Sequence, residues 1–304
     1  MLSKALSHFP QFRFREGEKR LWNPILKKTF AIRPEEQVRL ALVDYLILEA
    51  GLSASRISFE SPVKLPGDKS SSRTDIICYD SDFKPLLLVE CKAPDIKLDE
   101  KAAIQVARYN QKVGAPYLLV SNGTLDYWFE VEGEEVKFLP DLPELFHSTK
   151  KVSRDLAYWT ERSFIGEKLN QEASSFALES CMQLYEEPHQ PVKYLGFDDF
   201  PPEFALAHYY RIFGFKENRK VGLCLSANLN GETRLNTVLN VNGANTAFCT
   251  VSLNALTENE NRAAEVHSGK GVHKLNLAEE MEFGFGKKIG DLSDRFHEVL
   301  SRYS

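Results

Sequence analysis

The sequence lacks the features that mark a secreted or membrane-embedded protein. Its 304 residues contain no apolar run near the roughly 20 residues needed to span a bilayer. The opening segment, MLSKALSHFPQFRFREGEKR, has no apolar core of the kind that a secretory signal requires. We therefore expect a cytoplasmic protein with no membrane partner.

Cysteine is also sparse, and two common catalytic motifs are absent. The five cysteines are scattered, and no two form a Cys-x-x-Cys pair, which argues against a zinc ribbon and against a disulfide scaffold. Neither the phosphate loop GxxxxGK[ST] nor the nucleophile elbow GxSxG is present. ATP-driven motor activity and acyl hydrolysis by a serine are therefore not expected.

Positive charge is not in excess over the whole chain. The sequence has 38 Lys and Arg against 43 Asp and Glu, a net charge of −5, so a generally basic nucleic-acid-binding surface is not expected. The N-terminal 39 residues depart from this balance, with nine Lys or Arg and four Asp or Glu. Such a local excess can attract a polyanion, although a run of charges is commonly only a solvated face.

Composition and length are those of a globular protein with two domains. The chain is 43% apolar and 27% charged, and a domain typically takes about 150 residues. The stretch 140–152, which contains two prolines and a Lys-Lys pair, is a plausible boundary. We predict one domain over residues 1–150 and a second over 151–304.

Residue patterns in the first half predict an α/β unit. Residues 1–33 are expected to be irregular, and Pro34 and Gly51 delimit a helix. Further elements follow in the order strand, strand, strand, helix, strand and hairpin, at 56–63, 74–80, 84–93, 99–114, 115–123 and 125–139. This order predicts a mixed sheet flanked by helices.

The second half carries weaker signals. Residues 153–187 are expected to be helical, and 219–256 to form three or four strands joined by Asn-Gly turns. An amphipathic helix is predicted at the C-terminal end. We expect an α+β domain with an antiparallel sheet, and its role is not assigned.

One group of residues in the first half carries chemistry. Asp75 lies on a predicted strand, and Glu90 and Lys92 lie two apart on another, so the period of a strand places them on one face. Two carboxylates with an amine form a site of hard oxygen ligands suited to Mg²⁺ or Mn²⁺, and the carbonyl of Cys91 is a further candidate ligand. The alternative is a surface ion pair at the strand ends, worth about 0–1 kcal/mol. The apolar neighbours in LLLVECKAP favour the site, because buried charges are costly unless they are paired or bind a metal.

Neighbouring segments supply further candidates. Glu35 and Glu36 lie on the helix before the sheet, where one could add a carboxylate to the metal site. Gln105 and Tyr109 are four residues apart and share a face of the helix after Lys92. Lys69 and Arg73 precede Asp75 and are available for phosphate contacts. The predicted nucleic-acid-binding residues are these two cations together with Arg39 and Arg108.

Five motifs over residues 20–123 together resemble the N-terminal nuclease domain of type I restriction enzyme R subunits. They are Pro34-Glu35-Glu36-Gln37-Val38-Arg39, Arg73-Thr74-Asp75-Ile76, Glu90-Cys91-Lys92-Ala93-Pro94, Gln105 with Tyr109-Asn110, and Ala115-Pro116-Tyr117 with Asn122-Gly123. No single motif is specific, whereas their order and spacing together are.

The resemblance implies a restriction-endonuclease-like core of the PD-(D/E)xK group. It implies that Asp75 and Glu90 bind Mg²⁺ or Mn²⁺, that Lys92 is catalytic, and that Gln105 and Tyr109 support the site. Glu35 fits the pattern of the family better than Glu36 as the carboxylate on the helix. Arg33 stands where the family often has a threonine as helix cap, which concerns the cap and not the metal site.

These residues predict a metal-dependent DNA endonuclease that is similar to an R subunit but lacks the helicase motor. The expected partners are DNA and the subunits of a restriction–modification system, and a homodimer is possible. One alternative is a catalytically inactive module of nuclease fold that binds DNA or a partner protein. Another is a structural or inhibitor-like protein whose working part is the second half.

Overall fold

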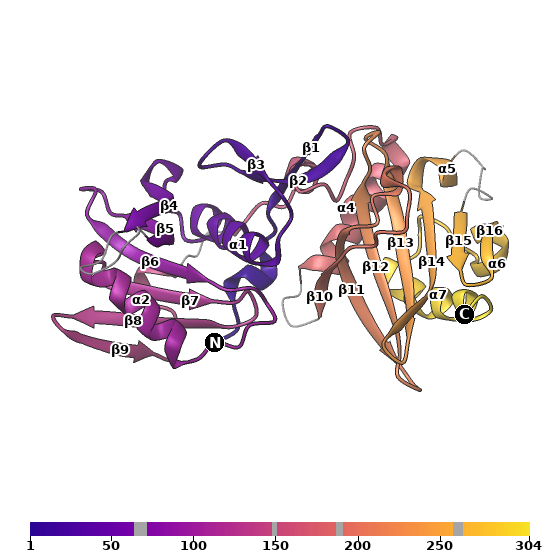
Figure 1. The fold of residues 1–304 in the computed structure, drawn as a ribbon. Coiled ribbons are helices and arrows are strands. Elements are labelled where there is room, and N and C mark those ends of the chain that lie inside the picture. The colour runs from indigo at the N-terminus through magenta and orange to yellow at the C-terminus, as the bar shows by residue number, and fades with distance from the viewer. Residues whose placement is uncertain (64–71, 148–150, 187–190, 258–263) are drawn as a thin grey trace. The chain divides into compact units, whose positions relative to one another are not determined.

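The computed structural model describes residues 1–63, 72–147, 151–186, 191–257 and 264–304. The chain divides into two compact units. The first contains Met1–Gln11 and Arg20–Val152, and the second contains Phe12–Lys19 and Ser153–Ser304. The first unit is built on a mixed sheet and the second on an antiparallel sheet, each with helices, as the sequence predicts (Figure 1).

The first unit is built on a six-stranded mixed sheet. Its strands, which follow one another in the sheet in chain order, are β4 (Ile57–Val63), β5 (Ser72–Tyr79), β6 (Pro85–Cys91), β7 (Tyr117–Ser121), β8 (Asp126–Glu132) and β9 (Glu135–Leu139). Among the described strands of this sheet, β6 and β7 are the one parallel pair, and helix α2 (Glu100–Val113) makes the crossover between them. The observed strands and α2 confirm the succession of elements along the chain that the sequence predicts.

Helix α2 covers one face of this sheet through a compact apolar core. Its Ala102 and Val106 are buried together with Ile77, Leu88 and Leu118 of the strands. Asp99 caps the helix by accepting a hydrogen bond from the N–H of Ala102 at 3.1 Å. Gly114, with φ of +73°, ends the helix in the left-handed conformation that glycine adopts without strain. Both boundaries agree with the sequence pattern.

Helix α1 (Pro34–Leu48) is buried along most of its length. Its buried residues run without interruption from Glu36 to Leu46, so polar side chains of the helix lie inside the protein. Pro34 occupies the first turn, and Arg33 makes no side-chain cap, as expected from the sequence. Because a buried charge must be paired, the acidic and basic residues of this helix need partners on the sheet.

The N-terminal residues form ordered structure that the sequence analysis missed. Strands β1 (Gln11–Arg15), β2 (Glu18–Asn23) and β3 (Lys28–Phe30) form a three-stranded sheet, so the prediction of an irregular segment was wrong. Glu16 and Gly17 both have positive φ, +53° and +80°, which is the geometry of a tight hairpin. The alternation of Phe and Arg in this stretch was the available signal.

The second unit is built on a seven-stranded antiparallel sheet. Its strands follow chain order: β10 (Val192–Leu195), β11 (His208–Phe215), β12 (Arg219–Ala227), β13 (Thr233–Val241), β14 (Ala244–Ser252), β15 (Ala264–Ser268) and β16 (Gly271–Leu275). Three of these fall in the predicted strand region, and the other four were missed. Asn242 and Gly243, both with positive φ, form the predicted Asn-Gly turn between β13 and β14.

The second unit also contains several helices. They are α3 (Leu156–Glu161), α4 (Gln171–Tyr185), α5 (Leu253–Thr257), α6 (Leu277–Met281) and α7 (Leu292–Ser301). Of these, α4, α5 and α7 pack on the sheet. The prediction of continuous helix over 153–187 was wrong, because the chain leaves the helix after Glu161 and re-enters it at Gln171. At Gly166 a side chain would stand 2.3 Å from the carbonyl oxygen of Gly231, so tertiary packing determines this break.

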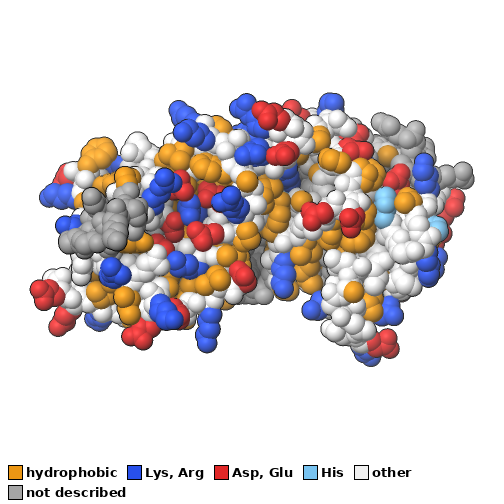
Figure 2. All heavy atoms as spheres, viewed as in Figure 1, with side chains coloured by type: hydrophobic (Ala, Val, Ile, Leu, Met, Phe, Trp, Pro, Cys, Tyr) orange, Lys and Arg blue, Asp and Glu red, His pale blue; other side chains and the backbone are white. Residues whose placement is uncertain are grey.

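The remaining ordered pieces are short 3-10 helices. They are η1 (Lys4–Ser7), η2 (Ala54–Arg56), η3 (Glu144–Phe146), η4 (Pro202–Phe204) and η6 (Ile289–Asp291). Within the described ranges, none of the helices is both long and apolar enough to cross a membrane. On the face seen in Figure 2, Lys and Arg side chains are interspersed with Asp and Glu among the coloured residues.

Candidate active site

Asp75 of β5 and Glu90 of β6 lie at the same end of two neighbouring strands. The antiparallel pairing of Ile76 with Val89 brings the two carboxylates next to each other in the sheet. Asp75 is 9% exposed and Glu90 is 5% exposed, so both are taken out of water. The backbone N–H of Cys91 donates to Oδ2 of Asp75 at 2.6 Å. The structure therefore brings together the two residues that the sequence proposed as metal ligands.

Lys92 completes the group just beyond the end of β6. Its Nζ donates to Oε1 of Glu90 at 2.8 Å and to Oε1 of Gln105 at 3.1 Å. The backbone N–H of Lys92 donates to the carbonyl of Ser121, which continues the pairing with β7. The ammonium is thus held over the site by the sheet on one side and by α2 on the other.

Gln105 and Tyr109 of α2 support this arrangement. Nε2 of Gln105 donates to Oε1 of Glu90 at 2.8 Å and to the hydroxyl of Tyr109 at 3.3 Å. Gln105 therefore bonds both members of the Glu90–Lys92 ion pair and restricts their rotamers. This is the supporting position that the resemblance implied for the pair.

The burial of like charges dominates the electrostatics of the site. Burial, and then the neighbouring Asp75 carboxylate, raise the pKa of Glu90 to about 7, against the opposing effect of Lys92. Burial also raises the pKa of Asp75 above its ordinary value, although Arg39 and the N–H of Cys91 oppose the shift. In both cases the charged carboxylate is costly in this environment, which is the condition that a bound cation would relieve.

Arg39 of α1 is the second cation at the site. Its guanidinium contacts Oδ1 of Asp75 at 2.7 Å, and its side chain is 8% exposed. It also forms ion pairs with Glu35 and Glu36, at 3.0 and 2.9 Å, and approaches Glu60 at 3.4 Å. A contact of Arg39 with nucleic acid, as predicted from the sequence, would require these buried ion pairs to break.

The two candidate carboxylates on α1 are in different environments. Glu36 is buried, and its Oε1 has no hydrogen-bond partner among the described residues. The side chain of Glu35 is 47% exposed. An unpaired buried oxygen is costly, so the structure favours Glu36 over Glu35 as a further oxygen ligand, the reverse of the preference drawn from the motif.

Glu60 is a member of the cluster that sequence reasoning missed. It lies on β4 between Phe59, which pairs with Ile76, and Ser61, which pairs with Thr74, so it stands opposite Asp75 in the sheet. Glu60 has φ of +52°, an unusual conformation for a residue with a side chain. Its carboxylate approaches the guanidinium of Arg39 at 3.4 Å, and no sequence motif marks it.

Two further predicted nucleic-acid-binding residues, Arg73 and Arg108, are described by the structure and have no ion pair with this cluster among the described residues. Arg73 of β5 and Arg108 of α2 are both exposed. Lys69 lies outside the described residues. The candidates for DNA contact are therefore dispersed around the site.

The donor atoms at the site match the chemistry of a hard divalent cation. Oxygen atoms of Asp75, Glu90 and Glu36 are the ligand type that Mg²⁺ and Mn²⁺ prefer. In the arrangement observed, however, no three His, Cys, Asp or Glu side chains in the described part of the chain converge into a metal-binding group. The reason is visible in the contacts: Arg39 holds Asp75, and Lys92 with Gln105 holds Glu90.

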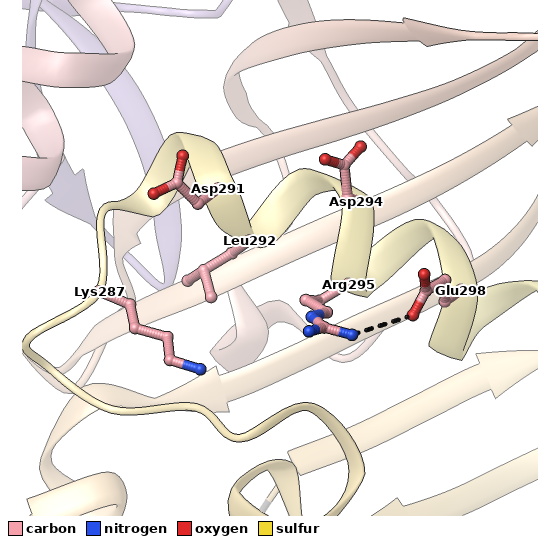
Figure 3. Close-up of a pocket in the computed structure, with 6 residues that line it drawn as sticks. All are labelled: Lys287, Asp291, Leu292, Asp294, Arg295 and Glu298. Atoms are coloured by element: carbon pink, nitrogen blue, oxygen red, sulfur yellow. Dashed lines mark hydrogen bonds and ion pairs between the residues drawn. The ribbon is translucent and has the colours of Figure 1, made fainter.

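The second unit contains a hollow at its surface. It has a volume of about 480 Å³ and is lined by Lys287, Asp291, Leu292, Asp294, Arg295 and Glu298 (Figure 3). Arg295 pairs with Glu298 across one turn of α7 at 3.5 Å. The lining mixes both signs of charge at the surface, and none of the predicted site residues belongs to it.

Comparison with known families gives a match over the first unit. Residues 34–143 match the family model of the type I restriction enzyme R protein N terminus (HSDR_N). This stretch includes Glu35, Asp75, Glu90, Lys92 and Gln105, and so contains the whole cluster described above. Residues 34–143 are thus similar to the N-terminal module of an R subunit, while residues 144–304 lie outside the match.

The other comparisons add little. One solved structure is similar, the fragment of a putative HsdR subunit of a type I restriction enzyme from Vibrio vulnificus YJ016, at 14% identity and a TM-score of 0.24. The alignment covers 47% of this chain and 32% of that one, so this chain spans about a third of the length of that fragment. No curated protein matches.

Proposed function

We propose that this chain is a divalent-metal-dependent DNA endonuclease of the PD-(D/E)xK group, acting in a restriction system. The observation that carries the proposal is the convergence of Asp75, Glu90 and Lys92 at one end of two central strands, with Nζ of Lys92 2.8 Å from Glu90. The family match of residues 34–143 supports it.

The cation would be Mg²⁺ or Mn²⁺, held by Asp75 and Glu90. The Cys91 carbonyl and Oε1 of Glu36 are the further oxygen atoms available to it. When bound, such a cation supplies a Lewis acid that lowers the pKa of a water molecule and neutralises charge on a phosphate.

The side chains of the protein supply orientation and a fixed positive charge. In phosphodiester hydrolysis water adds to phosphorus and one P–O ester bond breaks, while negative charge grows on the phosphate oxygens. The Lys92 ammonium is placed to stabilise that charge, and its pKa is raised, because its contacts with Glu90 outweigh the lowering effect of burial. Gln105 is hydrogen-bonded to both the Lys92 ammonium and Glu90, and so fixes their relative positions.

A plasmid assay tests this function. The wild-type protein with Mg²⁺ or Mn²⁺ should nick supercoiled DNA, and Lys92→Ala and Glu90→Ala should each reduce the rate by about 10²-fold or more. The matched control is Lys84→Ala, which removes an exposed lysine just before β6 and should cut like the wild type. Absence of nicking by the wild type with either metal, on plasmid and linear DNA alike, would contradict the proposal.

A catalytically inactive DNA- or partner-binding module is the second candidate function. The engagement of Asp75 by Arg39, and the lack of a three-ligand group in the described residues, favour it. Such a module would bind DNA with an affinity indifferent to Mg²⁺ and would not nick it. Filter binding with and without Mg²⁺, carried out beside the plasmid assay, separates the two functions.

The partners follow from the same proposal. DNA is the substrate, subunits of a restriction–modification system are the protein partners, and the cytoplasm is the place of action. A homodimer would place two copies of the site on the two strands of DNA. Residues 151–304 are proposed as an accessory domain of these assemblies.

A further inference from the structure

Arg39 is the centre of a buried network of carboxylates. Its two terminal nitrogen atoms share the oxygen atoms of four acidic residues, namely Glu35, Glu36, Glu60 and Asp75, at distances between 2.7 and 3.4 Å. The guanidinium also lies over the ring of Phe59, 5.4 Å from its centroid. A guanidinium remains charged under all ordinary conditions, so it is a permanent counter-ion inside this site.

The network nevertheless carries an excess of negative charge. With Glu90 there are five carboxylates, and within the described residues they form ion pairs with two cations, Arg39 and Lys92. Three of the five acids, Glu36, Asp75 and Glu90, are buried. Buried like charges repel one another strongly because little water screens them. The site therefore has a deficit of positive charge that one divalent cation would largely cancel.

Arg39 and a cation would compete for the same oxygen of Asp75. Oδ2 of Asp75 accepts the N–H of Cys91, which belongs to the strand and does not move independently. Oδ1 is the oxygen held by Arg39. The neighbouring Oε1 of Glu36 has no partner among the described residues, whereas its Oε2 pairs with Arg39. Arg39 thus blocks one ligand and leaves another unused.

We propose that Arg39 is an internal competitor of the divalent cation, which holds Asp75 and Glu36 in the metal-free protein and must release Asp75 when the cation binds. This inference rests on the proposed function, because it assumes that a cation binds at Asp75. It gives Arg39 a regulatory role in place of a contact with DNA: the guanidinium sets the metal concentration at which the site is assembled.

Metal titration of an Arg39 variant tests the inference without any cleavage assay. Isothermal titration of Mn²⁺ into Arg39→Gln should show binding about tenfold tighter or more than into the wild type, because one buried positive charge and one competing ligand are removed. Arg73→Gln is the matched control. It removes an exposed arginine two residues from Asp75, and screening by water should keep its effect within about twofold.

The opposite result is equally informative. If Arg39 instead organises the carboxylates for the cation, Arg39→Gln binds Mn²⁺ more weakly than the wild type, and the inference is overturned. Equal affinity of the two proteins overturns it as well. Circular dichroism establishes that the variant is folded. If Arg39→Gln does not fold, Arg39→Lys carries the same test: its single amine engages fewer carboxylates, and binding no tighter than the wild type overturns the inference.

The design separates this inference from the proposed function. Asp75→Asn provides the baseline, since it removes the contested ligand. Mn²⁺ binding by the wild type that is lost in Asp75→Asn supports the metal site, whatever Arg39→Gln does. If neither the wild type nor any Arg39 variant binds Mn²⁺ above that baseline, the metal-dependent function fails and the role of Arg39 fails with it.

Discussion

Gln105 shows how one uncharged side chain can organise two charged ones. It donates to Glu90 and accepts from Lys92, so both members of the ion pair are hydrogen-bonded to α2. The amide of Gln105 adds no charge to the site, but its hydrogen bonds restrict the rotamers of the two long charged side chains. We therefore regard Gln105 as a positioning residue.

Truncation of this side chain should slow cleavage without weakening DNA binding. We expect Gln105→Ala to reduce the nicking rate at saturating DNA by about 10- to 100-fold, because misplacement of a catalytic group by an ångström is that costly. Its dissociation constant for DNA in Ca²⁺ should stay that of the wild type. Tyr109→Phe removes only a hydroxyl at 3.3 Å from Gln105 and should change the rate by about threefold or less. A loss of DNA affinity in parallel with rate would show that Gln105 serves binding instead.

Lys19 of the second unit is in an unusual environment for a lysine. Although the residue is only partly buried, its Nζ lies 2.8 Å from Nδ1 of His208 and 4.7 Å from the centre of the Phe12 ring. Burial of the ammonium lowers the pKa of Lys19 to about 7. His208 is fully buried, and burial lowers the pKa of its imidazole well below the ordinary value.

This depressed pKa predicts a pH-dependent stability. Between pH 7 and about 10 the unfolded chain keeps a proton on Lys19 that the folded protein has released, so stability should rise with pH across this range. Lys19→Met removes the titration. Urea denaturation at pH 7.5 and 9.5 measures this. The free energy of unfolding should increase more between the two pH values in the wild type than in Lys19→Met. A pH-independent difference would mean that Lys19 titrates normally.

At the scale of elements, the position of α1 determines where Glu36 and Arg39 lie. The turn between β7 and β8 contacts this helix closely at Gly123, which has φ of +76°. A side chain at Gly123 would stand 2.8 Å from Cγ2 of Val38, a core residue of α1. The Asn-Gly pair recognised in the sequence as a turn thus also packs the helix that carries the site.

The glycine contact can be tested with a matched pair of substitutions. Gly133 also has positive φ, +63°, but an added side chain there meets nothing within 4 Å. Gly133→Ala should cost about 1 kcal/mol for backbone strain alone, and Gly123→Ala should cost about 2–4 kcal/mol because overlap with Val38 adds to it. Urea unfolding measures both. Equal losses in the free energy of unfolding would show that α1 shifts to accommodate the added methyl group without a free-energy penalty.

The elements that the sequence predicted best are those with local signals. Helix α2 has an aspartate at its start and a glycine at its end, and both do what their residue types favour. The pattern failed where packing overrides it. The helical stretch predicted over 153–187 breaks because the backbone at Gly166 lies against Gly231, a contact that has no signature nearby in the chain.

At the scale of the whole molecule, the candidate chemistry lies within the first unit. The family match ends at residue 143, and the second unit is an antiparallel sheet with helices that the match does not cover. The net charge of the chain is −5, so its total charge predicts no general attraction to DNA. Recognition of DNA would then depend on local cations such as Arg73 and Arg108 or on partner subunits.

The sequence by itself determined which residue types meet at the site. Asp75, Glu90, Lys92 and Gln105 stand in ordered motifs, and strand and helix periodicity is a local property that places them on facing surfaces. Only the tertiary structure decided how their charges are balanced. Arg39 reaches Asp75 from α1, and Glu60 of β4 reaches Arg39; such contacts depend on the packing of segments that are distant in the chain. Ion pairing in a buried site is a property of three-dimensional neighbours, because burial and distance together set its strength.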